Sequence, residues 1–249
     1  MTEDTEWLGY FVGWEEKGFD FGIGADGSSV IHPKKNEKRP GHKGIPVEYL
    51  LEEEIDGKWV RRRIIEENGL MSETAKGLDP KKPVSVTMIF AGGSKIQWTH
   101  APSRGAFALI PKVLEKKTEN RIRVGIEFVM PRLYETETMP EGRELKKMLS
   151  EDYVRGRRLK DGKKIRVKFS DLEDDIKDEK YLHDGASAIE VQSNGIMGNT
   201  FLLENRDEKS GRIDILTKGP LYNSFRFVWM AETQKLGEKD TYISFGLKE

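Results

Sequence analysis

Apolar and polar residues alternate with a period of two through most of the chain. In residues 121–130, apolar side chains take every second position and mostly charged residues lie between them. Residues 163–169, 224–230 and 241–247 repeat this pattern. A strand with one dry face and one wet face has this periodicity, which is typical of antiparallel sheets. Glycine-containing dipeptides that tolerate positive φ separate the runs, as hairpin turns require.

This pattern predicts an all-β fold, a mainly antiparallel β-sandwich of roughly 12 strands with one or two short helices. We expect one domain over residues 1–249. An alternative boundary lies near residues 136–150, where the strands give way to a helix.

Helical periodicity is confined to two segments. Within residues 141–150, Leu145, Met148 and Leu149 share one stripe, which predicts a short helix. Residues 170–185 begin with a Ser–Glu capping box followed by acidic residues, which predicts one or two helical turns or an acidic loop.

The first hairpin that can be registered by hand turns at an Asp-Gly dipeptide, residues 56–57. A two-residue turn pairs Glu54 with Trp59 and sets opposite charges across from each other on a solvated face. Glu53 and Arg62 then fall on the apolar face, either at its rim or beside a bulge.

The second hairpin contains two adjacent glycines. A three-residue loop at 92–94 pairs Phe90 with Ile96 and keeps apolar residues on one face, whereas a two-residue loop mixes the faces. This register predicts a glycine in the left-handed conformation, Trp98 on the buried face and His100 at the end of that face.

One of the densest clusters of chemically able side chains ends this strand and comprises Trp98, His100 and Arg104. It suits an aromatic platform with polar neighbours at the end of a sheet, where loops often bind ligands. The alternative is a core tryptophan, a strand-end histidine and a loop arginine. Trp14, in an aromatic first strand, joins the ligand-binding candidates because ring faces stack on sugar C–H bonds.

Charge and composition exclude several classes of function. The chain has 42 Lys and Arg against 43 Asp and Glu, which argues against wholesale binding of nucleic acid or anionic membrane. A local basic face remains open, because residues 154–168 are rich in Arg and Lys. No apolar run approaches the roughly 20 residues that span a bilayer. We expect a soluble protein, either cytoplasmic or exported with its signal already removed.

The chain has no cysteine, so disulfides and thiolate metal sites are excluded. Its four histidines are far apart and form no local metal-ligand pair, and no cofactor or catalytic motif is present. We therefore expect no metal and no cofactor. Glu127 lies mid-strand on the face opposite an apolar one; if that face were covered, its pKa would be raised. We expect a wet face and an ordinary carboxylate.

The leading interpretation is a carbohydrate-associated β-sandwich protein, either a glycan-binding module or a relative of a glycan-processing enzyme. Its partner would be a glycan. The alternative is a non-catalytic structural or protein-interaction module. A concave sheet face lined by Trp, Arg, His and two carboxylates would favour the first, and a convex charged surface with every tryptophan buried would favour the second. The sequence identifies no catalytic residue, and it indicates neither a compartment nor an oligomeric state.

Overall fold

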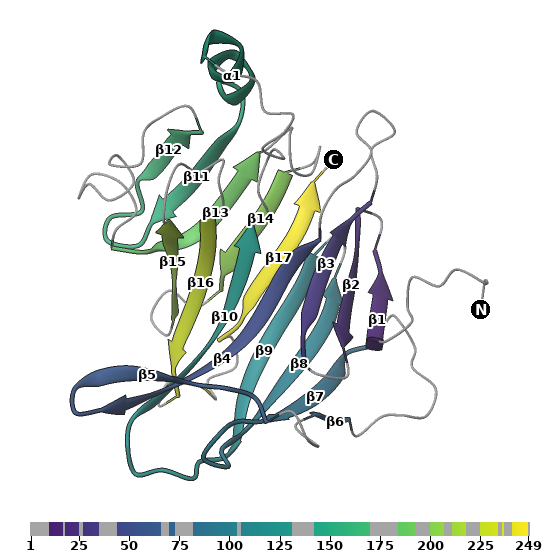
Figure 1. Ribbon diagram of the computed structural model, residues 1–249, viewed down its shortest axis with the longest axis vertical. Coiled ribbons are helices and arrows are strands. Elements are labelled where there is room, and N and C mark those ends of the chain that lie inside the picture. The colour runs from purple at the N-terminus through teal and green to yellow at the C-terminus, as the bar shows by residue number, and fades with distance from the viewer. Residues whose placement is uncertain are drawn as a thin grey trace.

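Antiparallel strands dominate the computed structural model of the chain (Figure 1). The residues it describes are 10–16, 18–24, 27–34, 44–65, 70–72, 82–103, 106–130, 142–169, 184–192, 200–206, 211–217, 225–233, 236 and 241–248. Within them lie seventeen strands and one helix, so the all-β, mainly antiparallel class is confirmed. The expected count of roughly 12 strands is too low, because many strands are only five or six residues long.

The front half of the sheet carries β4 at its centre. Each strand in it is antiparallel to the next, and β5 (Lys58–Arg62) pairs with the far end of β4. In spatial order, its other strands are β1 (Tyr10–Glu15), β2 (Phe19–Gly24), β3 (Ser29–Pro33), β4 (Ile45–Ile55), β10 (Ile122–Met130), β16 (Phe225–Glu232) and β15 (Gly211–Thr217).

The back half is a second antiparallel ladder. A pairing of Ala186 with Ile213 joins it to the front half. In spatial order, its strands are β12 (Lys164–Lys168), β11 (Tyr153–Arg158), β13 (Ala186–Gln192), β14 (Thr200–Asn205), β17 (Ile243–Lys248), β9 (Ala106–Glu115), β8 (Lys95–Ser103), β7 (Val84–Ile89) and β6 (Leu70–Ser72).

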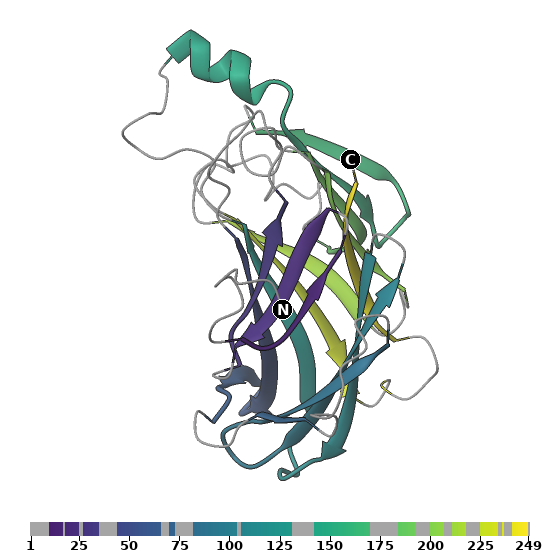
Figure 2. The ribbon, with the colours of Figure 1, turned by 90° about the vertical axis from the view of Figure 1, so that its right-hand side faces the viewer.

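The sheet curls so that its two halves face each other across an aromatic core. In Figure 2, β4 lies to the left and β17 to the right. Trp98 of β8 contacts Tyr49 of β4 and Trp229 of β16, with ring centroids 5.3 and 6.4 Å apart. Phe128 of β10 contacts Phe201 of β14 at 5.9 Å. These tilted and edge-to-face pairs add geometric preference to the burial of apolar area.

The β4–β5 hairpin has the predicted register, with Glu54 opposite Trp59. Asp56 and Gly57 both have positive φ, 49° and 73°, as a two-residue type I′ turn requires.

Glu53 lies at the rim of the apolar face of this hairpin. The ladder continues without a shift, and the carboxylate accepts hydrogen bonds from Arg62, Asn120 and Thr118. These bonds, that from the Thr118 hydroxyl above all, lower the pKa of the Glu53 carboxyl to about 2. Of the two settings expected for Glu53, the rim is therefore the one observed, and no bulge intervenes.

The β7–β8 hairpin has a three-residue loop, but the loop lies at residues 91–93 rather than 92–94. The Phe90 amide donates to the Ser94 carbonyl, and Val86 faces Trp98. The predicted register is therefore wrong by two residues. A shift of two keeps every side chain on its face, so the predicted burial of Trp98 is confirmed. Both loop glycines have positive φ, 96° and 86°.

Helix α1 (Gly142–Leu149) confirms the helix expected over residues 141–150. Its Leu149 side chain is buried. The second helical segment falls mainly on residues 170–183, which lie outside the described residues. No helix in the described part of the chain is long and apolar enough to cross a membrane.

Gly125 allows β10 and β16 to approach closely, and an added Cβ would lie 2.3 Å from the Trp229 carbonyl oxygen. We expect Gly125→Ala to lower the free energy of unfolding by roughly 1–3 kcal/mol, because backbone atoms cannot move aside. Urea unfolding measures the change. The control is Gly18→Ala, whose Cβ would meet atoms at ordinary contact distance, 3.4 Å or more. Equal stability of the two variants would contradict the close approach.

Candidate functional site

Strand β4 changes its neighbour along one edge. Val47 is the last residue of β4 that pairs with β3, and Leu51 is the first that pairs with β5. The stretch from Glu48 to Leu50 between them pairs with β10 on its other edge and with neither β3 nor β5. This exchange leaves a gap in the front half of the sheet.

A pocket of about 430 Å³ lies at this gap, and we call it the β4-edge pocket. Its volume falls in the range of small-ligand sites, roughly 300–1,000 Å³. Its lining residues are Gly27, Ser28, Val47, Glu48, Tyr49, Leu50, Arg61, Arg62, Arg63 and Ile64. Three consecutive arginines and one carboxylate therefore border a cavity that is otherwise largely apolar or backbone.

The three arginines have different surroundings. Arg61 contacts the carboxylates of Glu48 and Glu127, and Arg62 forms a hydrogen-bonded pair with Glu53. Arg63 is exposed, and its guanidinium has no partner among the residues that the structure describes. The Arg63 carbonyl accepts a hydrogen bond from the Ala91 amide, which holds the backbone of this segment against the tip of the β7–β8 hairpin.

Tyr49 lines the pocket and is held from behind by His100. The Tyr49 hydroxyl lies 2.7 Å from His100 Nε2, and His100 Nδ1 lies 3.2 Å from the Val84 carbonyl oxygen. A carbonyl only accepts, so Nδ1 carries the proton and Nε2 accepts from the tyrosine hydroxyl. This chain of hydrogen bonds links β4 in the front half to β7 and β8 in the back half.

Burial changes the acidity of both groups. Desolvation lowers the pKa of His100 from 6.5 to about 4, against the opposing effect of its backbone hydrogen bonds. Desolvation also raises the pKa of the Tyr49 hydroxyl well above its ordinary value. At neutral pH, the histidine is therefore neutral and the tyrosine protonated, as the hydrogen bond between them requires.

Three of the four predicted ligand-binding residues lie inside the core. Trp98 and His100 are 0 % exposed and Trp14 is 2 % exposed. His100 is the last fully buried residue on its face of β8, since Pro102 is partly exposed, so its predicted position at the end of the buried face is confirmed. Arg104 falls outside the described residues. A direct contact of these rings with ligand stays a prediction; their burial places them behind the pocket wall instead.

These buried rings form the support of Tyr49. Trp98 packs on the Tyr49 ring at 5.3 Å, and the His100 ring stacks on Trp14 at 5.4 Å. The sequence cluster thus lies next to the candidate site without forming its surface. The arginines of β5 do form it, although their alternation alone indicates no more than the solvated face of a hairpin.

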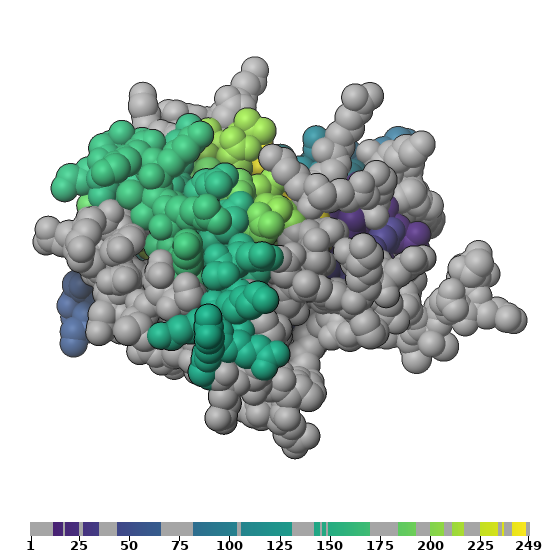
Figure 3. Space-filling model, turned by 90° about the horizontal axis from the view of Figure 1, so that it is seen from above, coloured from purple at the N-terminus to yellow at the C-terminus, as the bar shows by residue number. Residues whose placement is uncertain are grey.

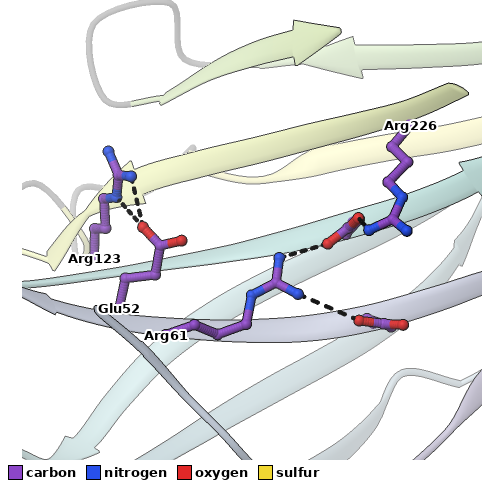
Figure 4. Close-up of polar contacts among 6 residues, drawn as sticks. Glu52, Arg61, Arg123 and Arg226 are labelled. Atoms are coloured by element: carbon purple, nitrogen blue, oxygen red, sulfur yellow. Dashed lines mark hydrogen bonds and ion pairs between the residues drawn. The ribbon is translucent and has the colours of Figure 1, made fainter. Parts of the chain in front are cut away.

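Beside the pocket, Glu127 of β10 lies on the outer face of the front half, the face away from the aromatic core. It is 0 % exposed, so the expectation that Glu127 lies on a wet face is wrong. Arg61 Nη2 lies 2.5 Å from Glu127 Oε2, and Arg226 Nη1 lies 2.7 Å from Oε1. Figure 4 shows Arg61 and Arg226 approaching from β5 and β16. Two guanidiniums, each partly exposed, thus shield and neutralise one buried carboxylate.

The pairing of β10 with β4 explains why the burial of Glu127 was not expected. Glu127 faces Glu48 directly on β4, and two like charges in such a pair destabilise a sheet. Arg61 contacts both carboxylates and removes the conflict. The two arginines are 66 and 99 residues away from Glu127 in sequence. Alternation identifies the face, but no local signal shows what covers it.

The same outer face carries further charged groups and one aromatic ring. Arg123 pairs with Glu52, as Figure 4 shows, and its guanidinium lies 4.4 Å from the ring centroid of Trp59. Trp59 is partly exposed. The surface therefore combines an indole, guanidiniums and carboxylates. A small apolar cluster lies among these charges, formed by Leu50, Val228 and Met230.

No metal site is apparent in the described part of the chain, where no group of three or more His, Asp or Glu side chains could hold an ion. The arginines and the glutamate that line the β4-edge pocket offer hydrogen bonds and charge. Arginine forks bind carboxylate or other planar anions in two-point contacts, and carboxylate oxygens accept from hydroxyl groups.

Comparison with known proteins relates the fold to an enzyme that acts on a sugar. No family model matches the chain, and no curated protein sequence matches it. The α-N-acetylgalactosaminidase NagBb from Bifidobacterium bifidum matches with a TM-score of 0.57 in its GalNAc complex and 0.58 in its Gal-NHAc-DNJ complex, at 10 % and 11 % identity. The match covers 96 % of this chain and 36 % of NagBb, so the chain spans about a third of that protein's length.

A galactose mutarotase related enzyme from Lactobacillus acidophilus matches over 96 % of this chain and 97 % of its own. Its identity is 12 % and its TM-score is 0.47, which is too low to establish a shared fold. The fold of this chain is therefore similar to that of part of a carbohydrate-acting enzyme, NagBb. At such identities, the likeness concerns the fold alone.

Protonation of His100 should couple stability to pH. The native pKa of about 4 lies below the unfolded value of 6.5, so its contribution is complete above pH 6.5 and is lost as pH falls towards 4. The loss amounts to about 3 kcal/mol. We expect His100→Gln to be less stable at neutral pH but to have a flatter stability profile in this window. Urea unfolding across the window measures both. The exposed His32 provides the control His32→Gln, and equal slopes in all three proteins would contradict the assignment.

The Glu127 cluster predicts a strong coupling between distant residues. We expect Arg226→Met to lower the free energy of unfolding by about 1–2 kcal/mol, because a buried carboxylate loses one of its two partners. In a Glu127→Gln background, the same change should cost less than about 0.5 kcal/mol. A double-mutant cycle by chemical unfolding gives the coupling. Additive effects would show that the two side chains act independently.

Proposed function

We propose that this protein binds a saccharide that carries a carboxylate, with the β4-edge pocket as the binding site. The observation that carries the proposal is the exposed Arg63 guanidinium at the border of the pocket, without a partner among the described residues. Arg62 beside it is already paired with Glu53. An acidic ligand would give Arg63 the two-point contact that no described residue supplies.

The remaining lining suits a sugar ring. Glu48 is exposed and offers oxygens that accept hydrogen bonds from hydroxyl groups. Tyr49, fixed by His100, lies beneath the pocket and is almost fully buried, and the partly exposed Ile64 at its border offers apolar surface on which C–H groups can pack. Small-ligand sites have this composition, with mainly apolar walls and a few placed polar groups.

The fold supports the choice of a saccharide over other carboxylates. The structure that it resembles belongs to an enzyme whose name gives an N-acetylgalactosamine group as its target. Trp59, with Arg123 at its ring, lies on the same outer face as Arg61 and offers a further surface for a longer chain. This support is by analogy of fold and composition.

We propose binding rather than catalysis. Both oxygens of Glu127 are engaged by guanidiniums, so this buried acid is held as a charge partner and is poorly placed to donate a proton or attack a sugar. Glu48, which faces it, is more than half exposed and also contacts Arg61. Glycoside hydrolysis requires one carboxyl group that is free to hold and donate a proton.

Titration with oligogalacturonate and with neutral galacto-oligosaccharides of equal length tests this proposal, with calorimetry as the measurement. We expect binding of the acidic oligomer only, weakened about tenfold by Arg63→Gln, the loss equivalent to one charged hydrogen bond. The control is Arg143→Gln, which removes an exposed arginine from α1.

Two results would contradict the proposal. Equal binding of acidic and neutral oligomers would show that the ligand's carboxylate is not recognised. Equal affinity of Arg63→Gln and wild type would show that the β4-edge pocket is not the binding site. No binding of either oligomer would favour the alternative, a structural or protein-interaction module.

A further inference from the structure

The outer face of the back half carries cations at one end of the sheet. Here β12, β11 and β13 pair in register, so that outward side chains form rows across the strands. We call the five outward cations of β11 and β12 the basic face. They are Arg155, Arg157, Lys164, Arg166 and Lys168.

Like charges face each other directly across β11 and β12. Arg166 pairs with Arg155, and Lys164 pairs with Arg157. Such pairs destabilise a sheet, and a fold selected only for stability would place acids at one member of each. In the front half, Glu52 faces both Arg61 and Arg123, so the opposite arrangement does occur in this chain.

Two carboxylates, those of Glu190 and Glu204, lie near the basic face, and both already have partners in the protein. Glu190 Oε1 accepts from Arg155 Nη1 at 3.1 Å and from the Tyr153 hydroxyl at 3.0 Å. Glu204 lies on β14 and contacts Arg206 at 3.4 Å.

Among the described residues, the basic face has more cations than nearby acids. Lys164 and Arg166 have no carboxylate partner among those residues. This excess of cations occurs although the whole chain has a net charge of −1.

The arginines are held in place by an aromatic ring. Arg166 lies 4.0 Å from the ring centroid of Tyr153, and Arg155 lies 5.1 Å from it. A guanidinium that stacks on a ring keeps the N–H groups at its edge available for an anion. Arg157 Nε donates to the Ser187 hydroxyl at 2.8 Å, which fixes the Arg157 guanidinium beside those of Arg155 and Arg166.

A cavity of about 340 Å³ opens among these groups, lined by Arg155, Arg157 and Lys164 together with Glu190, Leu202 and Glu204. Neighbouring strands are about 5 Å apart, and alternate residues of one strand about 7 Å apart. The cations are therefore spaced regularly, about 5 and 7 Å apart. This spacing fits a ligand chain with many closely spaced anionic groups better than it fits one isolated anion. In Figure 3, the hairpin of β11 and β12 forms a continuous green surface beside α1.

We infer that the basic face is a second binding site, and that its ligand is a sulfated polysaccharide. Sulfate groups supply the charge density that this spacing requires and accept two-point contacts from arginine forks. Single-stranded nucleic acid is disfavoured because Tyr153 is buried and lies against two guanidiniums, so its ring is not open for base stacking. The choice of a saccharide rests on the proposed function, but the site is separate from the β4-edge pocket.

Dextran sulfate and uncharged dextran are matched probes, because they differ only in their sulfate groups. We expect the wild-type protein to bind dextran sulfate alone, with an affinity that falls as salt rises. The double variant Lys164→Gln/Arg166→Gln should reduce the slope of log affinity against log salt by about two, one for each cation removed. The control Lys112→Gln/Lys116→Gln, which removes one lysine within β9 and one just beyond its end, should leave the slope unchanged.

A second variant separates binding from folding. Lys164→Glu converts a like-charge pair into an opposite one, so we expect a higher melting temperature together with weaker binding of dextran sulfate. Unchanged binding in both variants would overturn the inference. An oligothymidylate that binds as tightly as dextran sulfate at equal salt would also overturn it, by showing a site for nucleic acid or for any polyanion. Because Arg63→Gln leaves this face intact, loss of oligogalacturonate binding and loss of dextran sulfate binding are distinguishable.

Discussion

The hydrogen bond from the Tyr49 hydroxyl to His100 is the interaction on which the candidate site depends. It joins the two halves of the sheet inside a core of aromatic rings, where neither group can find water. An unpaired hydroxyl or imidazole there would cost more free energy than the bond itself provides. The pair therefore fixes how β4 sits against β8. Since Tyr49 also lines the pocket, the packing of the core determines the shape of the surface site.

A second constraint follows from the curled sheet. Because both halves turn their apolar faces inward, polar chemistry is restricted to the outer faces and to the places where strands exchange neighbours. β4 makes such an exchange between Val47 and Leu51, and a pocket forms there. A continuous edge would have closed that space with backbone hydrogen bonds. The site is thus a consequence of topology as much as of side-chain identity.

Strands, their alternation and one hairpin register are predictable from the sequence because they depend on neighbours within about ten residues. The register of the β7–β8 hairpin is predicted wrongly by two residues, since a shift of two preserves every face and the hydrophobic pattern cannot distinguish the alternatives. Burial of Glu127 is unpredictable for a different reason, because Arg61 and Arg226 reach it from distant strands. The predicted ligand cluster could not be tested from the sequence for a similar reason. Trp98 and His100 lie close together on one strand, but their spacing does not indicate whether that face of the strand is exposed to solvent. Here that face is the core, and the two residues support Tyr49 from inside.

The two outer faces differ in how their charged side chains are paired across strands. On the front half, Arg61, Arg123 and Arg226 each contact a carboxylate. The one like-charge pair described above, Glu48 facing Glu127, is bridged by Arg61. On the back half, Arg155 and Lys164 face other cations, which stability alone does not favour. A net charge near zero conceals both patterns, because it averages a balanced face with a basic one. The charge of the whole chain therefore constrains binding less than the register of its strands, which decides whether each cation faces an acid of the protein or is left for a ligand.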